Sequence, residues 1–396
     1  MPAIHPQHED RRTIQDEAHA RPPMPIEKPE AQAWHWVLHA PAGQCGIWPE
    51  AFNRTARHQL IECGDGVIRY ERHTEFAAIT FFGETEPGAA TLDLIAACPG
   101  PQIAGAKIVI SETADPENLF GGARLFGGEA LFDGVTVSTD FQIDDTGLVT
   151  FAVTGTFEDA FARGRLVKRL LDLETYRLAS LLALPLIRRL TPELETLERR
   201  AMEATDTIAS KAVDLQSAVE DLSATLKDVA RFKSSAAFRI SAAYAYDDLV
   251  AARLASLNET PVGQRQTMKG FVEHRLRPGI NSIRAFEART ERVAKTVADA
   301  LALARTQLDQ VAQRNAEALL SSMEKRARQQ VHLSQAVEGL SVAAITYYLV
   351  GLVGTALKAL PETGIPISQI QAVSIPLIAL FVWWNVRRAK GLLETL

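Results

Sequence analysis

Two long apolar segments near the C-terminus constrain the fold of this chain most strongly. Residues 341–360 contain one charged side chain, that of Lys358, and residues 365–386 contain none. A helix of about 20 residues rises about 30 Å, which matches the hydrocarbon core of a bilayer. The sequence therefore predicts two transmembrane helices, 341–360 and 365–386, joined by a short outer loop that contains Pro361 and Glu362. The alternative is a buried helical hairpin in the core of a soluble protein.

Basic residues flank the two apolar segments and predict their orientation. They precede the first segment and follow the second: Lys325, Arg326, Arg328, Arg387, Arg388 and Lys390. The positive-inside rule places such residues in the cytoplasm, so we expect both termini there. Trp383 and Trp384 come just before the basic cytoplasmic tail, residues 387–396, where indole rings favour the membrane interface. Trp383, Trp384, Arg387 and Arg388 are therefore expected to anchor the second helix at that interface.

Composition and charge exclude several classes of protein. The 396 residues include 42 Lys+Arg and 48 Asp+Glu, which gives a formal net charge of −6. A nucleic-acid binder needs a basic surface to neutralise phosphates, so we expect no nucleic-acid partner. The three cysteines, Cys45, Cys63 and Cys98, form no CxxC pair, which argues against a disulfide framework or a thiolate zinc site. The first 19 residues lack the apolar core of a signal peptide, so we expect the soluble part in a reducing cytoplasm.

Residues 34–157 are predicted to form an α/β or α+β cytoplasmic domain. Short apolar or β-branched runs alternate there with turn signals, which is typical of strands. The candidate strands are 34–40, 67–74, 76–83, 107–112, 135–143 and 148–155, and a helix is expected at 89–98. Residues 144–147, with the sequence DDTG, fit a hairpin loop between the last two strands.

Residues 158–340 are predicted to form long helices and a stalk. One helix covers 164–190 with an interruption at Pro185, and Thr191-Pro192 provides the N-cap and first residue of the next helix. In that next helix, apolar residues recur every three or four positions from Leu194 to Val229. This spacing is typical of a coiled-coil seam, which packs either within one chain or between chains.

The end of this region is expected to lead into the membrane. Another helix covers about 235–258, and the last one begins after Pro278-Gly279 and has no further Pro or Gly until Gly339. It continues directly into residues 341–360. The stalk is therefore expected to be continuous with the first membrane helix.

Four separated segments resemble one bacterial family. They are DEAHARPP (16–23), RYERHTEFAAITFFG (69–83), GRLVKRLLDLETYRLASLLALP (164–185) and VEGLSVAAITYYLVGLVG (337–354). In this order they are similar to a membrane-anchored family, domain of unknown function 3422, over nearly the whole chain. The resemblance implies no activity. It agrees with a C-terminal anchor in the bacterial cytoplasmic (inner) membrane.

The predicted architecture also resembles, more distantly, the CorA-type magnesium channels, which are homopentamers. The shared features are an α/β cytoplasmic domain, long helices, a stalk that leads into the first of two C-terminal membrane helices, and a basic tail. Gly354 followed by Pro361-Glu362 has the spacing that those channels use between their Gly-Met-Asn motif and their Pro-Glu loop. Thr355 and Ala356 replace the Met and the Asn, so the signature is broken and magnesium selectivity is not implied.

One face of the first membrane helix is a candidate pore lining. Its residues follow a spacing of three or four: Ala344, Tyr347, Gly351, Gly354 and Lys358. Small residues also let membrane helices approach closely, so plain helix packing is the simpler interpretation. Lys358 either forms a ring of cations that repels Mg²⁺ and favours anions, or extends to the outer membrane interface.

Residues 1–33 are predicted to form an extended N-terminal segment that carries the EAHARPP motif. Glu17, His19 and Arg21 combine a carboxylate, an imidazole and a guanidinium within five residues. They are candidates for capturing an anion or another ligand, or for contacting a second subunit. The alternative is a segment held against the α/β domain by Arg–carboxylate hydrogen bonds.

Catalytic, metal and cofactor motifs are not found. His35 and His39 are expected on a strand, about 13 Å apart, which is too far to share one metal ion. The Gly-rich stretch 119–134 lacks the Walker lysine and the GxGxxG spacing, so tight turns are expected there. The sequence contains no GxSxG, HExxH or CxxC motif. We therefore expect no metal, no cofactor and no enzymatic activity.

The sequence thus predicts an α+β or α/β cytoplasmic domain, long coiled-coil-like helices and a C-terminal two-helix transmembrane hairpin. Two functions fit this architecture. The first is a CorA-like homo-oligomer, a pentamer by that resemblance, whose cytoplasmic domain regulates the passage of an ion that the sequence does not identify. The second is a non-conducting membrane-anchored scaffold or sensor with an unidentified cytoplasmic partner. In both, the partners include the lipid bilayer and further copies of the chain.

Overall fold

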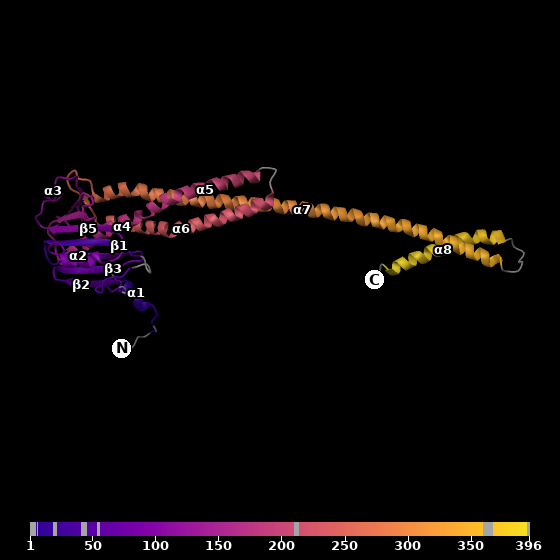
Figure 1. Cartoon of the computed structure of the whole chain (residues 1–396), viewed down its shortest axis with the longest axis horizontal. Coiled ribbons are helices and arrows are strands. Elements are labelled where there is room, and N and C mark those ends of the chain that lie inside the picture. Colours follow the sequence, from indigo (N-terminus) through magenta and orange to yellow (C-terminus); the bar gives the residue numbers. More distant parts are fainter. Residues whose placement is uncertain are drawn as a thin grey trace. The chain divides into compact units, whose positions relative to one another are not determined.

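The computed structural model describes residue 5 and residues 7–18, 22–40, 46–53, 56–209, 214–358 and 367–393. The chain divides into two compact units, Met1–Ala302 and Leu303–Leu396. The first unit contains a nine-stranded sheet with its covering helices, and the second contains long helices (Figure 1). The prediction of an N-terminal sheet domain followed by long C-terminal helices is confirmed at this level.

The sheet is mixed, with the strand order β2-β3-β4-β1-β5-β8-β7-β6-β9. Its strands are β1 (Ala31–His39), β2 (His58–Cys63), β3 (Gly66–Arg72), β4 (Phe76–Gly83), β5 (Gln102–Ser111), β6 (Phe126–Glu129), β7 (Thr136–Thr139), β8 (Val149–Thr154) and β9 (Thr260–Pro261). Neighbouring strands are antiparallel except for β5 and β8, which are parallel. A parallel pair needs a crossover connection, and the chain between these two strands supplies it with α3 (Pro116–Leu119), β6 and β7.

Alternation along the central strands gives the sheet two different faces. One face carries an apolar core made with helix α2 (Ala89–Ala96) and its flanks: Trp34, Leu38, Ile68, Tyr70, Ile79, Phe81, Ile95 and Cys98. The opposite face carries His35, Arg69, Glu71 and Thr80, all of them buried. Helix α4 (Ala160–Leu181) covers this polar face. A strand with both faces covered normally has apolar residues on both, so the polar face is unusual.

The predicted strands are found, with shifted ends, but β2, β6 and β9 are not among them. β6 lies inside the Gly-rich stretch 119–134, where only turns were expected. Gly127 has a φ of 129°, and a Cβ there would overlap the carbonyl oxygen of Val137 on β7. Close strand pairing therefore requires glycine at this position. The DDTG loop is confirmed, because the Asp144 carboxylate accepts hydrogen bonds from the amides of Thr146 and Leu148.

Two predicted helix boundaries in the middle of the chain are wrong. Helix α4 ends at Leu181 and α5 (Ala183–Ala209) begins at once, so Pro185 lies in the first turn of α5, where its missing N–H has no helical partner to lose. Pro192 lies inside α5 instead of starting a new helix. Helix α6 (Leu215–Ser256) runs from the end of the predicted seam through the helix expected at about 235–258, so these are not two separate helices. Its true start is set by Asp214, whose carboxylate accepts from the Gln216 amide at 3.1 Å.

Helix α7 (Met268–Lys358) joins the two units. It begins ten residues before Pro278 and contains that proline, so the predicted start after Gly279 is wrong. The same helix continues through residues 341–358, which confirms that the stalk and the first apolar segment form one helix.

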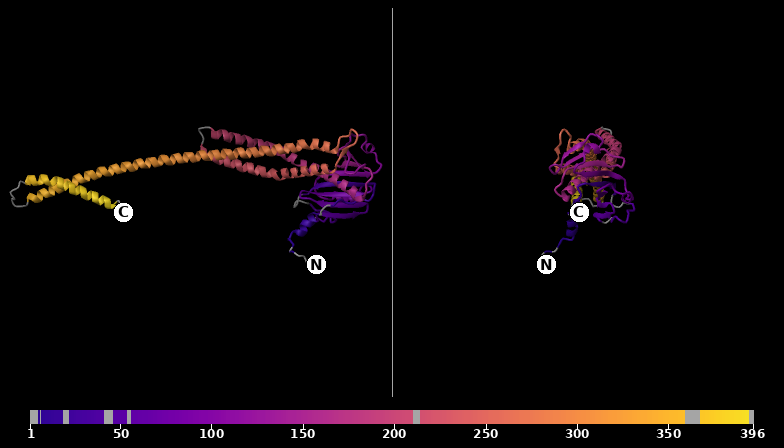
Figure 2. Two further views of the ribbon diagram at one scale, coloured as in Figure 1. Left: turned by 180° about the vertical axis from the view of Figure 1, so that it is seen from behind. Right: turned by 90° about the vertical axis from the view of Figure 1, so that its left-hand side faces the viewer.

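The apolar seam from Leu194 to Val229 packs within one chain. Leu194, Leu197 and Ala201 on α5 and Leu222 and Val229 on α6 are at most 4% exposed. The first part of α7 lies alongside both helices (Figure 2). There Arg289 makes a bidentate hydrogen bond with Glu198 of α5, and Tyr244 of α6 donates to Glu287. The alternative, a seam between chains, is not needed to bury these residues.

The second unit consists of the rest of α7 and helix α8 (Ile367–Leu393). Within the described residues, one helix, α7, has a segment long and apolar enough to cross a membrane, with a mean hydropathy of 1.6 and no buried residue in it. By length and composition, one of the two predicted spans is thus found among the described residues, and the predicted two-helix hairpin is not confirmed. Helix α8 reaches Leu393, so the predicted tail 387–396 begins as helix. Pro361 and Glu362 of the predicted outer loop lie outside the described residues.

Candidate functional site

A row of polar side chains crosses the sheet on the face that α4 covers. His35 of β1 pairs in register with Thr80 of β4, and Thr80 pairs with Arg69 of β3. Glu71 lies two residues after Arg69 on β3, so its side chain is on the same side of the sheet. His35, Arg69 and Thr80, which come from three different strands, are therefore adjacent because of strand register.

Helix α4 adds the other half of this site. Gly164, Lys168, Asp172 and Thr175 are spaced by three or four residues, so they share one face of the helix. This face lies on the sheet, where the Thr175 hydroxyl reaches the His35 ring. We call the following set the buried polar cluster: His35, Arg69, Glu71, Thr80, Lys168, Asp172 and Thr175.

Ion pairs organise the charged part of the buried polar cluster. Arg69 Nη2 donates to Glu71 Oε1 at 2.6 Å, and both side chains are at most 8% exposed. Lys168 Nζ lies 3.1 Å from Asp172 Oδ1 and 4.0 Å from Glu71 Oε1. Arg253 of α6 approaches Asp172 from the other side, at 2.9 Å. Burial acts to raise the pKa of Glu71, but the charges of Lys168 and Arg69 outweigh it and lower that pKa below its ordinary value.

The hydrogen bonds of His35 fix its tautomer. The Thr175 hydroxyl donates its single hydrogen to the Leu171 carbonyl oxygen at 2.8 Å, so toward the ring it can only accept. His35 Nε2, 3.0 Å from that hydroxyl, is therefore the protonated nitrogen. His35 Nδ1 then accepts from the Thr80 hydroxyl at 2.7 Å. Burial lowers the pKa of His35 to about 4, so the ring is neutral at physiological pH.

We expect His35 to make the folded chain sensitive to mild acid. The unfolded chain protonates this ring near pH 6.5 and the folded chain near pH 4, so between these values the unfolded state binds more protons. Stability is unaffected by this group above pH 6.5 and falls as the pH decreases toward 4, by about 3 kcal/mol in total. Denaturant unfolding of the full chain between pH 7 and about pH 5 measures this, and His35→Gln should flatten the curve. An unchanged curve in His35→Gln would contradict the assignment.

A segment that begins with the two prolines of the EAHARPP motif lies across the start of α4. We call residues 22–30 the strap. The Ile26 amide donates to the Ala160 carbonyl oxygen at 3.0 Å, and Arg163 donates to the carbonyl oxygens of Ile26 and Glu27 at 2.7 and 2.9 Å. A Cβ at Gly164 would overlap the Met24 carbonyl oxygen, so glycine permits this close crossing. The strap is thereby fixed at the edge of the buried polar cluster.

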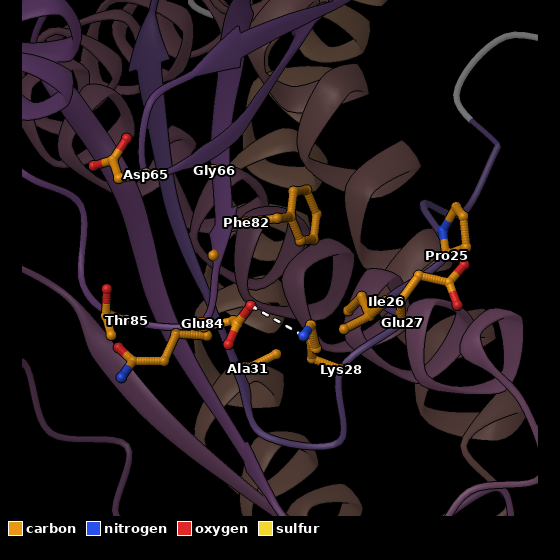
Figure 3. A pocket seen from close by; sticks show the side chains of 12 residues that line it. Pro25, Ile26, Glu27, Lys28, Ala31, Asp65, Gly66, Phe82, Glu84 and Thr85 are labelled. Atoms are coloured by element: carbon orange, nitrogen blue, oxygen red, sulfur yellow. Dashed lines mark ion pairs between the residues drawn. The ribbon is translucent and has the colours of Figure 1, made fainter.

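Two hollows adjoin the strap. The inner one is a cavity of about 10 Å³ within the buried polar cluster, lined by Met24, His35, Arg69, Glu71, Thr80, Phe82, Gly164, Lys168, Leu171 and Asp172. The outer one, the strap pocket, has about 280 Å³ and lies between the strap, the start of β1, the start of β3 and the end of β4. Lys28 and Glu84 point toward one another across it, 3.6 Å apart (Figure 3). Phe82 lines both hollows.

The N-terminal candidates are only partly described. Residues 1–33 are not wholly extended, because α1 (Arg11–Ala18) precedes the strap and β1 begins at Ala31. Glu17 belongs to α1, and its side chain lies outside the described part of the structure. His19 and Arg21 also lie outside it. Pro22 and Pro23, the last two residues of the EAHARPP motif, are described and belong to the strap.

The candidate pore-lining and membrane-interface residues differ in how far they are exposed. Ala344, Tyr347, Gly351 and Lys358 are exposed in the single chain, whereas Gly354 is buried. In α8 the Trp383 and Trp384 rings are about half exposed, and the guanidinium carbons of Arg387 and Arg388 lie 5.0 and 5.2 Å from their centroids. Each Arg is four residues after its Trp, so helical spacing makes both contacts.

The sequence patterns did not predict the buried polar cluster, although all of its residues except His35 stand in two of the segments that carry the family resemblance. Arg69, Glu71 and Thr80 belong to 69–83, and Lys168, Asp172 and Thr175 belong to 164–185. The sequence pattern that could have indicated this cluster is a strand in which the charged residues Arg69 and Glu71 alternate with the apolar residues Ile68 and Tyr70. Within the described residues, no group of three or more His, Cys, Asp or Glu side chains could hold a metal ion.

Comparison with curated protein sequences gives no match. Among solved structures, the chain is similar to BrvH, a flavin-dependent halogenase from Brevundimonas sp. BAL3, with 9% identity and a TM-score of 0.17. The match covers 70% of this chain and about half, 50%, of the halogenase. The expectation of no enzymatic activity is not borne out and is withdrawn. A TM-score this low assigns neither a fold nor a reaction to the chain.

The family comparison covers both units described above. The profile of the family DUF3422, "Protein of unknown function", matches residues 6–393. This range includes the strap, the buried polar cluster and the whole of α8. With a match over almost its full length, the chain belongs to the DUF3422 family.

Proposed function

We propose that the protein is a homo-oligomeric membrane protein of the bacterial cytoplasmic membrane, with both termini in the cytoplasm, whose sheet domain regulates ion passage between copies of α7. One observation carries this proposal. An 18-residue window of α7 has a mean hydropathy of 1.6, and no residue in that window is buried by the rest of the described chain. A continuous exposed apolar surface of this length has to be covered by lipid or by other protein.

Helix α8 is the second membrane helix in this proposal. Its exposed large side chains include Val373, Leu377, Leu380 and Phe381, and Pro376 is tolerated because neighbouring helices can satisfy the freed carbonyl. The Trp383–Arg387 and Trp384–Arg388 contacts suit the boundary between lipid and cytoplasm, where an apolar ring meets a charge. The loop with Pro361 and Glu362 then lies on the outer side.

Contacts between copies are supported by the small residues of α7. Ala344 and Gly351 are exposed, and a Cβ at Gly351 would meet no atom within 4 Å. Small residues allow membrane helices to approach closely, so this face suits contact between α7 helices around an axis. In a CorA-like pentamer, Ala344, Tyr347, Gly351 and Lys358 would line that axis. The CorA likeness rests on the sequence alone.

A membrane-anchored scaffold or sensor is the second candidate function. Ala356 favours it, because it offers no side-chain hydrogen bond where CorA-type channels have an asparagine at an ion-contacting position. The strap pocket, with about 280 Å³, also has the size of a site for a small cytoplasmic ligand. In this function the exposed face of α7 serves only to assemble copies.

Ion flux into proteoliposomes separates the two functions. We expect flux of a divalent cation or chloride with the wild-type chain, and its loss in Gly351→Leu, whose side chain fills the axis. Gly339→Leu is the matched control, since Gly339 is equally open but precedes the apolar segment, and it should conduct normally. Cross-linking must show that all three proteins are oligomers. A folded oligomer without flux for any ion would reject the channel and leave the scaffold or sensor.

A further inference from the structure

The buried polar cluster and its charged neighbour hold more positive than negative charge. The cations are Arg69, Lys168 and Arg253, and the carboxylates that face them are Glu71 and Asp172. His35 adds no charge, because its ring is neutral. The ordinary arrangement in a protein interior is full pairing of opposite charges, since an uncompensated buried charge is costly. The formal excess is one positive charge, in a group of cations of which Arg69 is 4%, Lys168 21% and Arg253 31% exposed.

A buried donor points to where the balancing charge would lie. Arg69 Nη2 donates to Glu71, but Arg69 Nε is buried and has no hydrogen-bond partner among the described residues. A buried donor without a partner costs about 1–3 kcal/mol, and more when the group is charged. Lys168 has three N–H donors, of which one is directed to Asp172, while Glu71 at 4.0 Å is beyond hydrogen-bond distance. Both cations line the inner cavity.

The size and walls of the inner cavity restrict what can occupy it. Its volume, about 10 Å³, suits a single water-sized atom, and a phosphate or carboxylate would not fit without movement of the strap. The His35 ring nitrogens and the hydroxyl groups of Thr80 and Thr175 already make hydrogen bonds with one another, and the Thr175 hydroxyl also donates to the Leu171 carbonyl oxygen. Glu71 and Asp172 also line the cavity, each paired with a cation. Met24, Phe82 and Leu171 add apolar surface, which strengthens electrostatic interactions inside.

We propose that this cavity binds one monoatomic anion of halide size, chloride in the cell, held by Arg69 Nε and Lys168 Nζ. The ion supplies the missing negative charge and gives the orphan donor its partner. Met24 and Phe82 roof the site, so the anion exchanges with solvent when the strap moves, and bound anion stabilises the closed strap. The proposal concerns the sheet domain and stands whether or not the protein conducts ions.

Thermal unfolding of the full chain in detergent tests this site. Sodium chloride and sodium bromide are compared with sodium gluconate at equal ionic strength, so that general screening is constant. We expect the melting temperature to rise by about 3 °C in either halide near ten times the dissociation constant, and to saturate. Lys168→Gln, which removes one of the two donors, should abolish the rise. Lys233→Gln, the same change in a half-exposed pair with Glu291, should retain it.

A second measurement uses the wild-type protein, so it can be made even if no variant folds. The NMR line of chloride should broaden in the presence of wild-type protein and sharpen again when bromide displaces it. Arg69→Lys keeps the charge but deletes Nε, so it should weaken the broadening at least tenfold if it folds. Equal melting temperatures in chloride and gluconate, or a Lys168→Gln variant that responds like wild type, would overturn the proposal and leave water in the cavity.

Discussion

Replacing Ile345 and Leu352 together by arginine is expected to remove the full chain from carbonate-washed membranes. Both side chains are exposed in α7, at 44% and 67%, so neither change disturbs packing within the chain. Each arginine near the centre of a membrane helix costs about 2.5–3.5 kcal/mol of insertion free energy. The two changes together therefore cost about 6 kcal/mol, which is enough to prevent insertion of 341–360. Helix α8 would then have to carry Arg387 and Arg388 across the bilayer, which is also unfavourable.

The measurement is the share of protein that stays in the membrane pellet, followed by immunoblot, and we expect at least a tenfold decrease. A matched control places the same charges outside the apolar segment, as Leu320→Arg with Leu333→Arg. These residues are 65% and 67% exposed on the same helix. The control should remain in the pellet. Retention of the Ile345/Leu352 variant at the wild-type level would show that residues 341–360 do not lie in lipid.

Glu71→Ala is expected to destabilise the sheet domain by about 3–5 kcal/mol. The Glu71 side chain is 8% exposed and pairs with Arg69, which is 4% exposed. Its removal leaves the Arg69 guanidinium buried without a counter-charge, and this is the costly way to break a buried ion pair. Denaturant unfolding at pH 7, where Glu71 is ionised in wild type, measures the change.

Two further variants separate charge from packing. Glu84→Gln removes a carboxylate from the exposed pair with Lys28, and we expect less than about 1 kcal/mol. Arg69→Met combined with Glu71→Leu replaces the buried pair by apolar groups of similar size and should recover much of the stability lost in Glu71→Ala. A Glu71→Ala variant as stable as Glu84→Gln would mean that Arg69 reaches solvent, contrary to its burial.

Local patterns were sufficient for much of the helical half of the chain and for the central strands. The alternation of FAAITFFG predicts β4, and the absence of Pro and Gly before Gly339 predicts the long continuous helix α7. Prolines were misleading as boundaries. Pro192 and Pro278 lie inside helices, because packing of α5, α6 and α7 against one another outweighs the loss of one backbone hydrogen bond.

Local sequence patterns did not predict the short strands and the edge strands. β2 is an edge strand with two strongly apolar residues, Leu60 and Ile61, and β6 contains two glycines that local preference assigns to turns. Both strands exist because a neighbour offers them hydrogen bonds, β3 for β2 and β7 for β6. Strand preference depends on such surroundings more than on the residue itself.

The sequence by itself determined the features that depend on one segment: the apolar runs, the helical stalk, the alternation of the central strands and the family resemblance. Tertiary structure decided which polar residues meet. His35, Thr80 and Arg69 are adjacent through strand register, and Lys168 and Asp172 join them because α4 packs on that face. It also decided that the Leu194–Val229 seam is filled within one chain. Many alternative non-local contacts have similar energies. Which of them form depends on the whole fold, so no single segment of the sequence contains enough information to predict them.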